Sequence, residues 1–432
     1  MKVLVLFSLN FILTRMSFLL FDSDCVNGRN KQNQGLNQIR SKMKQIKAKL
    51  KAAVLTFTLT FCPLLSQLNV QAQIPVAPTQ FRMIDLTPDG VSSAIQGISS
   101  FQQVGKVGGF LGGVGSPTTH AFLWSDVGLS PVDLHPSFLD FPELNSPGNS
   151  VAYATDTVNQ VGSGVGAATN QRTIALRWSG TAESAEVLLP PFNNHGAEAF
   201  GTCNGQAVGY GRTVEAVNGR GTVRQVGGPL HAVLWNSNST IGIDLNNGAQ
   251  ATVALACDGS QQVGYGGSMD ISGQLAQPKA MMWFGNRNNF VFLHPNGYAS
   301  SQAVAVSGGI QVGHAEIQFQ TGRQISFNSR AVVWSGSAAS MVTLPLPSGF
   351  IFNYFATSVS NGMVAGYGID TTNNQKHALY WASASTPVVD LNQFLPPGYI
   401  DASANGIDSS GRIVGKAYSG TSYHAVMWVP VP

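Results

Sequence analysis

The chain has 432 residues, of which 48 are glycine and only 10% are charged, a composition that favours short strands and tight turns over long helices. Its formal net charge is +3, but ten of the 24 basic residues and only two of the 21 acidic residues lie in the first 72 positions. The remaining chain holds 14 basic and 19 acidic side chains, a net charge of −5, which excludes nucleic-acid binding through overall basicity.

The first 72 residues are expected to be absent from the mature protein. Met43 begins a secretory signal, in which residues 44–51 form the basic region and residues 52–65 the apolar region. Val70-Gln71-Ala72 is a small-residue cleavage site before Gln73. We therefore expect residues 43–72 to be a signal peptide and the protein to be secreted, either extracellular or periplasmic, without membrane contact after cleavage.

Residues 1–42 are interpreted as a gene-model extension upstream of a true translation start at Met43. The alternative is an unusually long leader or a membrane anchor. Residues 1–20 approach the length of about 20 residues that spans a bilayer, although Arg15 interrupts them.

Residues 73–432 form a repeat domain with a unit of about 50 residues, a period typical of propellers and solenoids. Every tryptophan of the chain occupies the same position in this unit, and the intervals between successive copies are 54, 57, 48, 51, 47 and 47 residues. The seven are Trp124, Trp178, Trp235, Trp283, Trp334, Trp381 and Trp428. Six of them have a leucine ten residues downstream: Leu134, Leu188, Leu245, Leu293, Leu344 and Leu391.

Each unit predicts four short strands. The first is rich in small residues, as in Ala152-Tyr153-Ala154, which suits a position near a central axis where blades crowd together. A turn such as Cys203-Asn204-Gly205 follows, because Asn-Gly supplies the positive φ angles that tight hairpins require. A second strand then ends on Val-Gly, as at Val208-Gly209.

The third strand, His120-Ala121-Phe122-Leu123-Trp124 in the first unit, is apolar on both faces and must therefore lie between two other layers. The midpoint of Trp124 and Leu134 is Leu129, next to a turn glycine. The interval of ten residues thus predicts that tryptophan and leucine oppose each other across a hairpin between the third and fourth strands.

The repeated unit is cut in a complementary way at its two ends. Trp428 has no leucine ten residues later, whereas Met83-Ile84-Asp85-Leu86 matches a fourth strand without a preceding tryptophan. This pattern predicts an all-β, seven-bladed β-propeller in which an N-terminal strand completes the last blade and removes the open sheet edges. An open β-solenoid and a ring with a different strand grouping are the alternatives.

Two cysteines of the repeat domain, Cys203 and Cys257, occupy equivalent turns in adjacent units. An exported protein enters an oxidising compartment, where a disulfide forms if the two Cα atoms lie within about 7 Å. Two separate buried thiols are an equally good interpretation at this level.

The seven copies of a Val-Gly strand, a His-Ala-Phe/Val-x-Trp strand and a following Asp-Leu resemble the HAF-repeat family of extracellular proteins over residues 82–432. Only His120-Ala121-Phe122 gives the complete tripeptide, and the histidine position is Ile174, Lys279 or Arg330 in three other units. The resemblance implies secretion and a β-repeat fold, and it implies no established chemistry.

No catalytic, cofactor or metal site is expected from the sequence. The strand-initial His120, His231, His377 and His424 are spread around the predicted ring, whereas a zinc ion needs three or four converging ligands. The chain has no Gly-x-Ser-x-Gly elbow after a strand, and its acidic residues show no recurrent placement. A cluster of three or more Asp, Glu, His or Tyr residues at the channel mouth would favour an enzyme instead.

The variable connections between strands give the best functional hypothesis. The segments that vary in length, between the second and third strands and between blades, fall on one face of the ring, where binding residues are often placed. The two longest, 210–229 and 135–150, supply the candidate partner-binding residues Phe138, Asp140, Phe141, Glu143, Arg212, Glu215, Arg220 and Arg224. We therefore predict a monomeric, non-catalytic scaffold that binds a glycan, peptide or surface partner through this loop-rich face. The alternative is a secreted hydrolase or lyase with its site at the mouth of the central channel.

Overall fold

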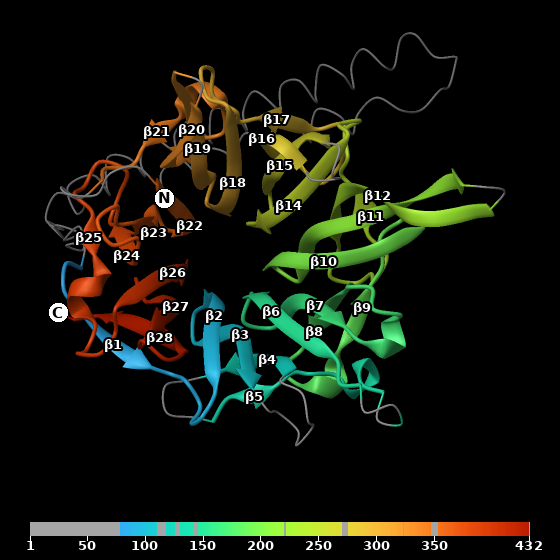
Figure 1. Cartoon of the computed structure of the whole chain (residues 1–432), viewed down its shortest axis with the longest axis horizontal. Coiled ribbons are helices and arrows are strands. Elements are labelled where there is room, and N and C mark those ends of the chain that lie inside the picture. Colours follow the sequence, from blue (N-terminus) through green and yellow to red (C-terminus); the bar gives the residue numbers. More distant parts are fainter. Residues whose placement is uncertain are drawn as a thin grey trace, which may run out of the picture. The chain divides into compact units, whose positions relative to one another are not determined.

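The computed structural model describes residues 78–109, 118–125, 130–141, 143, 146–219, 222–269, 275–322, 324–346 and 353–431. Within them the chain forms seven four-stranded antiparallel sheets arranged as the blades of a β-propeller (Figure 1), which confirms the predicted fold. The leader and its cleavage site lie outside the described residues. None of the helical segments in the described part is both apolar enough and long enough to cross a membrane.

Blades 1 to 6 use consecutive strands, ordered from the axis outward. Blade 1 comprises β2 (Ser92–Ser99), β3 (Gln102–Gly109), β4 (Thr118–Trp124) and β5 (Val132–Asp133). Blade 2 comprises β6 (Asn149–Thr155), β7 (Gln160–Val165), β8 (Ile174–Trp178) and β9 (Glu186–Leu188), and blade 3 comprises β10 (Asn194–Cys203), β11 (Gln206–Gly219), β12 (Thr222–Trp235) and β13 (Ile243–Asp244). Blade 4 comprises β14 (Ala251–Cys257), β15 (Gln262–Met269), β16 (Leu275–Trp283) and β17 (Phe290–Phe292).

Blade 5 comprises β18 (Ser300–Ser307), β19 (Ile310–Thr321), β20 (Gln324–Trp334) and β21 (Val342–Thr343). Blade 6 comprises β22 (Asn353–Ser360), β23 (Met363–Ile369), β24 (Lys376–Trp381) and β25 (Val389–Asp390). Blade 7 comprises β26 (Asp401–Ile407), β27 (Ile413–Tyr418), β28 (Tyr423–Pro430) and, from the other end of the chain, β1 (Phe81–Asp85). Short 3-10 turns cover Ser137–Leu139, Ala167–Thr169, Ala182–Ser184, Ala338–Ser340 and Leu391–Phe394.

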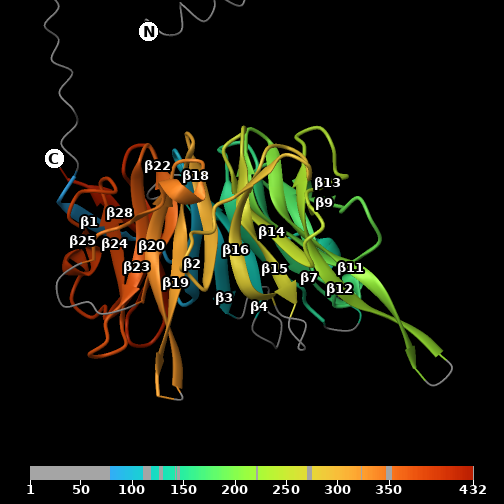
Figure 2. The same cartoon turned by 90° about the horizontal axis from the view of Figure 1, so that it is seen from above.

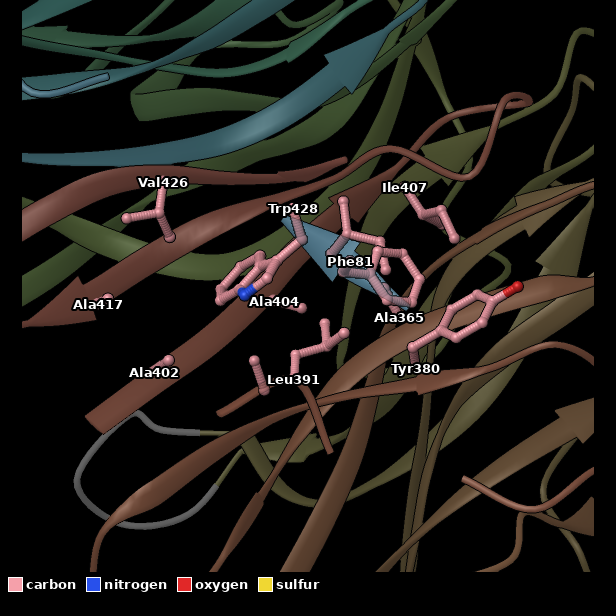
Figure 3. Close-up of a cluster of buried hydrophobic side chains, with 12 residues drawn as sticks. Phe81, Ala365, Tyr380, Leu391, Ala402, Ala404, Ile407, Ala417, Val426 and Trp428 are labelled. Carbon is pink, nitrogen blue, oxygen red and sulfur yellow. The ribbon is translucent and has the colours of Figure 1, made fainter. Parts of the chain in front are cut away.

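Blade 7 closes the ring as the sequence predicts. β1 pairs antiparallel with β28, from Phe81 opposite Pro430 to Asp85 opposite Val426. Phe81 is 5% exposed and meets the ring of Tyr380 from blade 6 edge-on, with 5.3 Å between centroids. Figure 3 shows Phe81 in the same apolar cluster as Trp428 and Leu391. The closing strand therefore completes both a sheet and a contact between blades.

The glycine of Val-Gly is required by a bulge in the neighbouring strand. In blade 2 the pairing of β6 with β7 shifts between Ala152 and Ala154, and a Cβ at Gly162 would overlap the Val151 carbonyl oxygen. The corresponding glycines of the other six blades face the bulged inner strand in the same way. Each second strand runs on beyond this glycine, so the prediction that it ends there is wrong: the glycine makes room for the bulge and does not terminate the strand.

The prediction that tryptophan and leucine oppose each other across a hairpin is also wrong. In blade 1, Phe122 pairs with Asp133 and Leu123 with Val132, and the Leu134 N–H donates to the Ala121 carbonyl at 2.8 Å. Leu134 therefore stands opposite Ala121, three residues before Trp124.

The leucine instead contacts the next blade. Each lies in one hydrophobic cluster with the tryptophan of the following blade, in the pairs Leu134 and Trp178, Leu188 and Trp235, Leu245 and Trp283, Leu293 and Trp334, Leu344 and Trp381, Leu391 and Trp428, and, across the closure, Leu86 and Trp124. Three of these indoles also donate to a carbonyl of the preceding blade: Trp124 to Leu86 at 3.0 Å, Trp235 to Leu189 at 2.9 Å and Trp381 to Pro345 at 2.7 Å. The fixed interval thus sets the contact between blades, which we call the seam.

Cys203 and Cys257 form a disulfide, with their Cα atoms 5.8 Å apart. They end the innermost strands β10 and β14, and each is 8% exposed. Of the two interpretations that the sequence left open, the structure selects the bonded one. The bond fastens blades 3 and 4 together beside the axis.

Candidate functional site

All seven innermost strands carry a β-bulge at the same position. The extra residue is Gln96, Tyr153, Phe200, Leu255, Val304, Thr357 or Asn405 in blades 1 to 7. A bulge leaves one residue unpaired and redirects its side chain. All seven, which we call the bulge ring, line one cavity of about 440 Å³ formed by the inner strands of every blade. Figure 1 shows these strands around the axis.

The residue after each bulge is small because the inner strands crowd together. The seven are Gly97, Ala154, Gly201, Ala256, Ala305, Ser358 and Gly406. A Cβ at Gly97 would lie 2.6 Å from the Tyr153 carbonyl oxygen of the next blade. Packing therefore fixes this position in every blade, while the bulge position beside it holds seven different side chains.

The bulge ring has an apolar arc and a polar arc. Blades 2 to 5 contribute Tyr153, Phe200, Leu255 and Val304, and the rings of Tyr153 and Phe200 lie 5.3 Å apart. Blades 6, 7 and 1 contribute Thr357, Asn405 and Gln96. The Asn405 amide donates to the Ile95 carbonyl at 2.7 Å, which fixes its orientation. The cavity lining as a whole exposes more polar than apolar surface, because turn residues such as Asp156 and Asn204 complete it.

The cavity does not open toward the long connections. Its lining runs from the bulges to the turns between first and second strands, including Asp156, Asn204 and Asp258. We call this side the turn face, and the side that carries the connections between second and third strands and between blades the loop face. The cavity and the candidate residues of the long connections therefore lie on opposite faces of the ring.

The carboxylates of the turn face are held by hydrogen bonds between blades. Asp156 accepts from the Asn159 N–H at 2.8 Å within its own turn and from the Gly205 N–H of the next blade at 2.6 Å. Asp258 repeats the pattern: burial raises the pKa of its carboxyl, but hydrogen bonds from Ser260, Gln261 and Gly309 outweigh this and hold the pKa below its ordinary value. These carboxylates stabilise turns. Among the described residues, no group of three or more His, Cys, Asp or Glu side chains is arranged to hold a metal ion.

A second polar cluster lies behind the apolar arc. The hydroxyls of Tyr153 and Tyr210 both donate to Glu198, at 3.2 and 2.7 Å. Burial, reinforced by the charge of Glu198, raises the pKa of Tyr153 to about 12, and the same causes raise the pKa of Tyr210. Two tyrosines and a glutamate are the residue types that would favour an enzyme, although only Tyr153 of the three lines the cavity. Both phenols remain protonated, however, and each donates its single proton to Glu198, so the cluster holds these side chains in place and offers no hydroxyl proton to the cavity.

On the loop face, the segment 210–229 is a hairpin and not the expected loop. Strands β11 and β12 continue outward from the blade, as Figure 2 shows, and the hairpin of β19 and β20 projects on the same side. Arg212 is half-buried and its guanidinium donates to the Gly228 carbonyl at 3.4 Å, whereas Glu215 is exposed. Arg220 and the side chain of Arg224 lie outside the described residues.

The segment 135–150 contains the 3-10 turn Ser137–Leu139, anchored by the fully buried Leu139. Phe138, Phe141 and Glu143 are exposed. Asp140 instead stabilises its own segment, because it accepts from the Gly148 N–H at 2.8 Å and pairs with His135 at 3.2 Å. Phe138 borders a pocket of about 350 Å³ that Arg172 and Asn194 also line.

The four strand-initial histidines each pair with an aspartate at the end of the fourth strand. Nδ1 meets the carboxylate at 2.7 to 3.1 Å in the pairs His120 and Asp133, His231 and Asp244, His377 and Asp390, and His424 and Asp85. In blades 2, 4 and 5 the histidine position is occupied by Ile174, Lys279 and Arg330. The aspartate position is then occupied by Val187, Phe292 and Thr343, respectively. Sequence reasoning missed this pairing, although the joint replacement of both residues was a visible signal.

Fold and channel together define the protein as a seven-bladed β-propeller with a ligand-sized cavity on its axis. No protein-family model matches the sequence, and no curated protein matches it either. Similar folds include an acylaminoacyl peptidase from Pyrococcus horikoshii, with 8% identity and a TM-score of 0.47 over 78% of this chain and 52% of that one. An oligogalacturonate lyase from Vibrio parahaemolyticus has 10% identity and a TM-score of 0.45, covering 82% and 94%.

A sialidase from Trypanosoma rangeli has 9% identity and a TM-score of 0.38, covering 82% of this chain and 59% of that one. The chain thus spans about half the length of the peptidase. At these identities and scores the similarities carry no argument about activity.

Proposed function

We propose that the protein is an exported binding propeller that holds part of a glycan in its central channel. The observation that carries this proposal is the bulge ring: seven different residues at one equivalent position of the repeat line one cavity of about 440 Å³. In a repeat scaffold, positions that pack are kept alike, whereas this position differs in every blade. Aromatic and aliphatic side chains on one arc of an otherwise polar lining suit a sugar ring, which has apolar faces and a polar edge.

Export is supported by three independent features. The disulfide between Cys203 and Cys257 is of a kind that persists in oxidising compartments. The sequence of residues 43–72 has the three regions of a secretory signal. The repeat resembles the HAF-repeat family of extracellular proteins, to which we assign the chain as part of this proposal.

The candidate residues of the loop face remain a second contact surface for the same partner. Phe138 beside Arg172 and Asn194 offers an aromatic wall with polar neighbours, on the face opposite the cavity. Substitutions on this surface test the proposal directly, because a partner bound only at the loop face would not be affected by changes in the bulge ring.

A glycan array probed with the secreted protein tests the proposal. We expect binding, and a loss of at least about tenfold in affinity for Phe200→Ala, which corresponds to about 1.4 kcal/mol. Phe319→Ala is the matched control, because Phe319 is 41% exposed on the hairpin of β19 and β20, away from the cavity. Unchanged binding by Phe200→Ala together with loss in Phe138→Ala would move the site to the loop face. An array without any bound glycan would refute the proposal.

A further inference from the structure

The His–Asp pair of blade 7 has a third member. The Ser422 Oγ lies 3.1 Å from His424 Nε2, and His424 Nδ1 lies 2.7 Å from Asp85 Oδ2. The serine immediately precedes β28, and the aspartate comes from the closing strand β1. A hydroxyl, an imidazole and a carboxylate joined in this order through the two ring nitrogens are the parts of a nucleophilic triad.

The hydrogen bonds of Asp85 define where the ring proton lies. Its carboxylate accepts from the Tyr399 hydroxyl at 2.7 Å and from the Thr87 N–H at 2.9 Å. Burial raises the pKa of Asp85, but the hydrogen bonds from Tyr399, Thr87 and His424 outweigh it and keep the pKa below its ordinary value. An ionised carboxylate at Nδ1 places the proton there, so the Nε2 lone pair faces Ser422 and can accept its proton.

These three residues border an open cavity of about 490 Å³ at the junction of blades 7 and 1. Pro88, Gly90, Val91 and Thr421 also line it, and the His424 side chain is 23% exposed. The nucleophile is therefore accessible to a small substrate. Asp89, another lining residue, disfavours an anionic acyl group, so the substrate should be uncharged at that end.

The other three His–Asp pairs provide an internal comparison. All four pairs join the third and fourth strands of a blade, so this structural role explains the histidine and the aspartate. The residue two positions before the histidine is Pro229 in blade 3 and Gln375 in blade 6, and in blade 1 it is Thr118, which is 3% exposed. The structural role of the pair therefore does not require a hydroxyl two residues before the histidine. In blade 7 this position holds Ser422, which lies beside an open cavity.

We propose that Ser422, His424 and Asp85 form a hydrolytic site for short-chain carboxylic esters, independent of the glycan in the channel. Ser422 Oγ attacks the ester carbonyl carbon while its proton passes to His424 Nε2. The bond between this carbon and the alcohol oxygen breaks, and the alcohol leaves with that proton. Water then gives a proton to His424 and attacks the acyl-serine, and the acid leaves as the proton returns to Ser422.

Covalent labelling of the whole secreted protein with a fluorophosphonate, followed by peptide mass spectrometry, tests this site. We expect the label on Ser422 and hydrolysis of p-nitrophenyl acetate that Ser422→Ala reduces about a thousandfold. Tyr399 is a positioning residue, so Tyr399→Phe should lower the rate and change its pH profile without removing the label.

His231→Ala is the matched control, since it removes the same pair in blade 3 without an adjacent serine. It should leave labelling of Ser422 and the rate unchanged. The proposal is overturned if folded wild-type protein is not labelled at Ser422. It is also overturned if Ser422→Ala retains the hydrolysis, since this substitution removes a single hydroxyl from a partly exposed position and leaves the fold intact. Because the channel is not involved, failure here leaves the glycan proposal standing, and glycan binding can fail while labelling succeeds.

Discussion

The seam between blades and the bulge ring are both built from seven copies of one position, but they behave in opposite ways. The seam repeats tryptophan and leucine in every blade, with each tryptophan no more than 1% exposed. The bulge ring never repeats a side chain, and all of its members are partly exposed. Within a repeat protein, identity between copies therefore marks packing, and difference between copies marks a position that packing leaves available for recognition.

The largest effect should come from breaking the seam at the ring closure. Deleting residues 81–86 removes β1, the buried Phe81 and the leucine that contacts Trp124, so we expect the free energy of unfolding to fall by at least about 5 kcal/mol. Arg82→Ala, an exposed change within the same strand, should alter it by no more than about 0.5 kcal/mol. Equilibrium denaturation measures both. A deletion variant as stable as the wild type would contradict closure by this strand.

Two leucines ten residues apart compare the two regions directly. Leu245 lies in the seam and is fully buried, so Leu245→Ala should cost about 2–5 kcal/mol. Leu255 lies in the bulge ring, and Leu255→Ala should cost less than about 1.5 kcal/mol, because part of its surface already contacts water. Chemical denaturation of the two variants side by side is the measurement. Equal losses would show that the bulge ring is part of the core.

A double-mutant cycle sharpens the assignment of the seam. Trp235→Ala should couple to Leu188→Ala of the preceding blade by about 0.5–3 kcal/mol, since both lie in one cluster. Its coupling to Leu245→Ala, ten residues downstream in its own blade, should be close to zero. The reverse result would restore the cross-strand pair that the sequence suggested.

Removal of the disulfide tests how far the inner strands depend on a covalent link. The bond closes a sequence separation of 54 residues, so Cys203→Ser with Cys257→Ser should destabilise the protein by about 2–4 kcal/mol. Thermal unfolding in the presence of a reductant should reproduce the effect in the wild type and leave the double variant unchanged. A reductant-insensitive wild type would argue against the bond.

The smallest effect concerns a pair outside both regions. The hydrogen bond to Asp390 raises the pKa of His377, burial opposes it, and nearby carboxylates add to the rise. A raised pKa in the folded state stabilises the protein below the ordinary value of about 6.5 and loses this contribution as pH rises through the folded-state pKa. The stability advantage of the wild type over His377→Gln should therefore shrink between about pH 5 and pH 8. Thermal unfolding at both pH values measures it, and an advantage that grows with pH would contradict the shift.

Sequence patterns predicted the blades and their number because the physics behind them is local. Trp124 and its six counterparts mark one unit each, and Asp85-Leu86 reveals the missing strand. The interval from Trp124 to Leu134 predicts one hairpin, and this prediction is wrong because spacing along a chain does not say whether a partner lies in the same sheet or the next. The bulge ring was hidden for a related reason: Tyr153 between two alanines looks like an irregular strand until the shift in pairing is seen.

Only part of the triad was beyond sequence reasoning. Ser422 and His424 are two residues apart, but Asp85 joins them only through closure of the ring. With Asp85 placed beside Asp244 and Asp390 in the repeat, closure would have brought it to His424. Ser422 borders an open cavity, whereas Thr118 at the equivalent position of blade 1 is buried. This difference depends on packing that no repeat pattern records.

The bond between His424 and Asp85 spans 339 residues, and this has a consequence for folding. Contacts between residues so far apart in the sequence form late, because the entropy cost of closing the intervening chain must be overcome first. During synthesis the closing strand is made first, yet it has no partner until β28 leaves the ribosome. Blades 1 to 6 can assemble in order, whereas the last blade and any site built on it appear only in the finished ring. Labelling of Ser422 would therefore report complete folding of the propeller, and partly folded or truncated chains would remain silent.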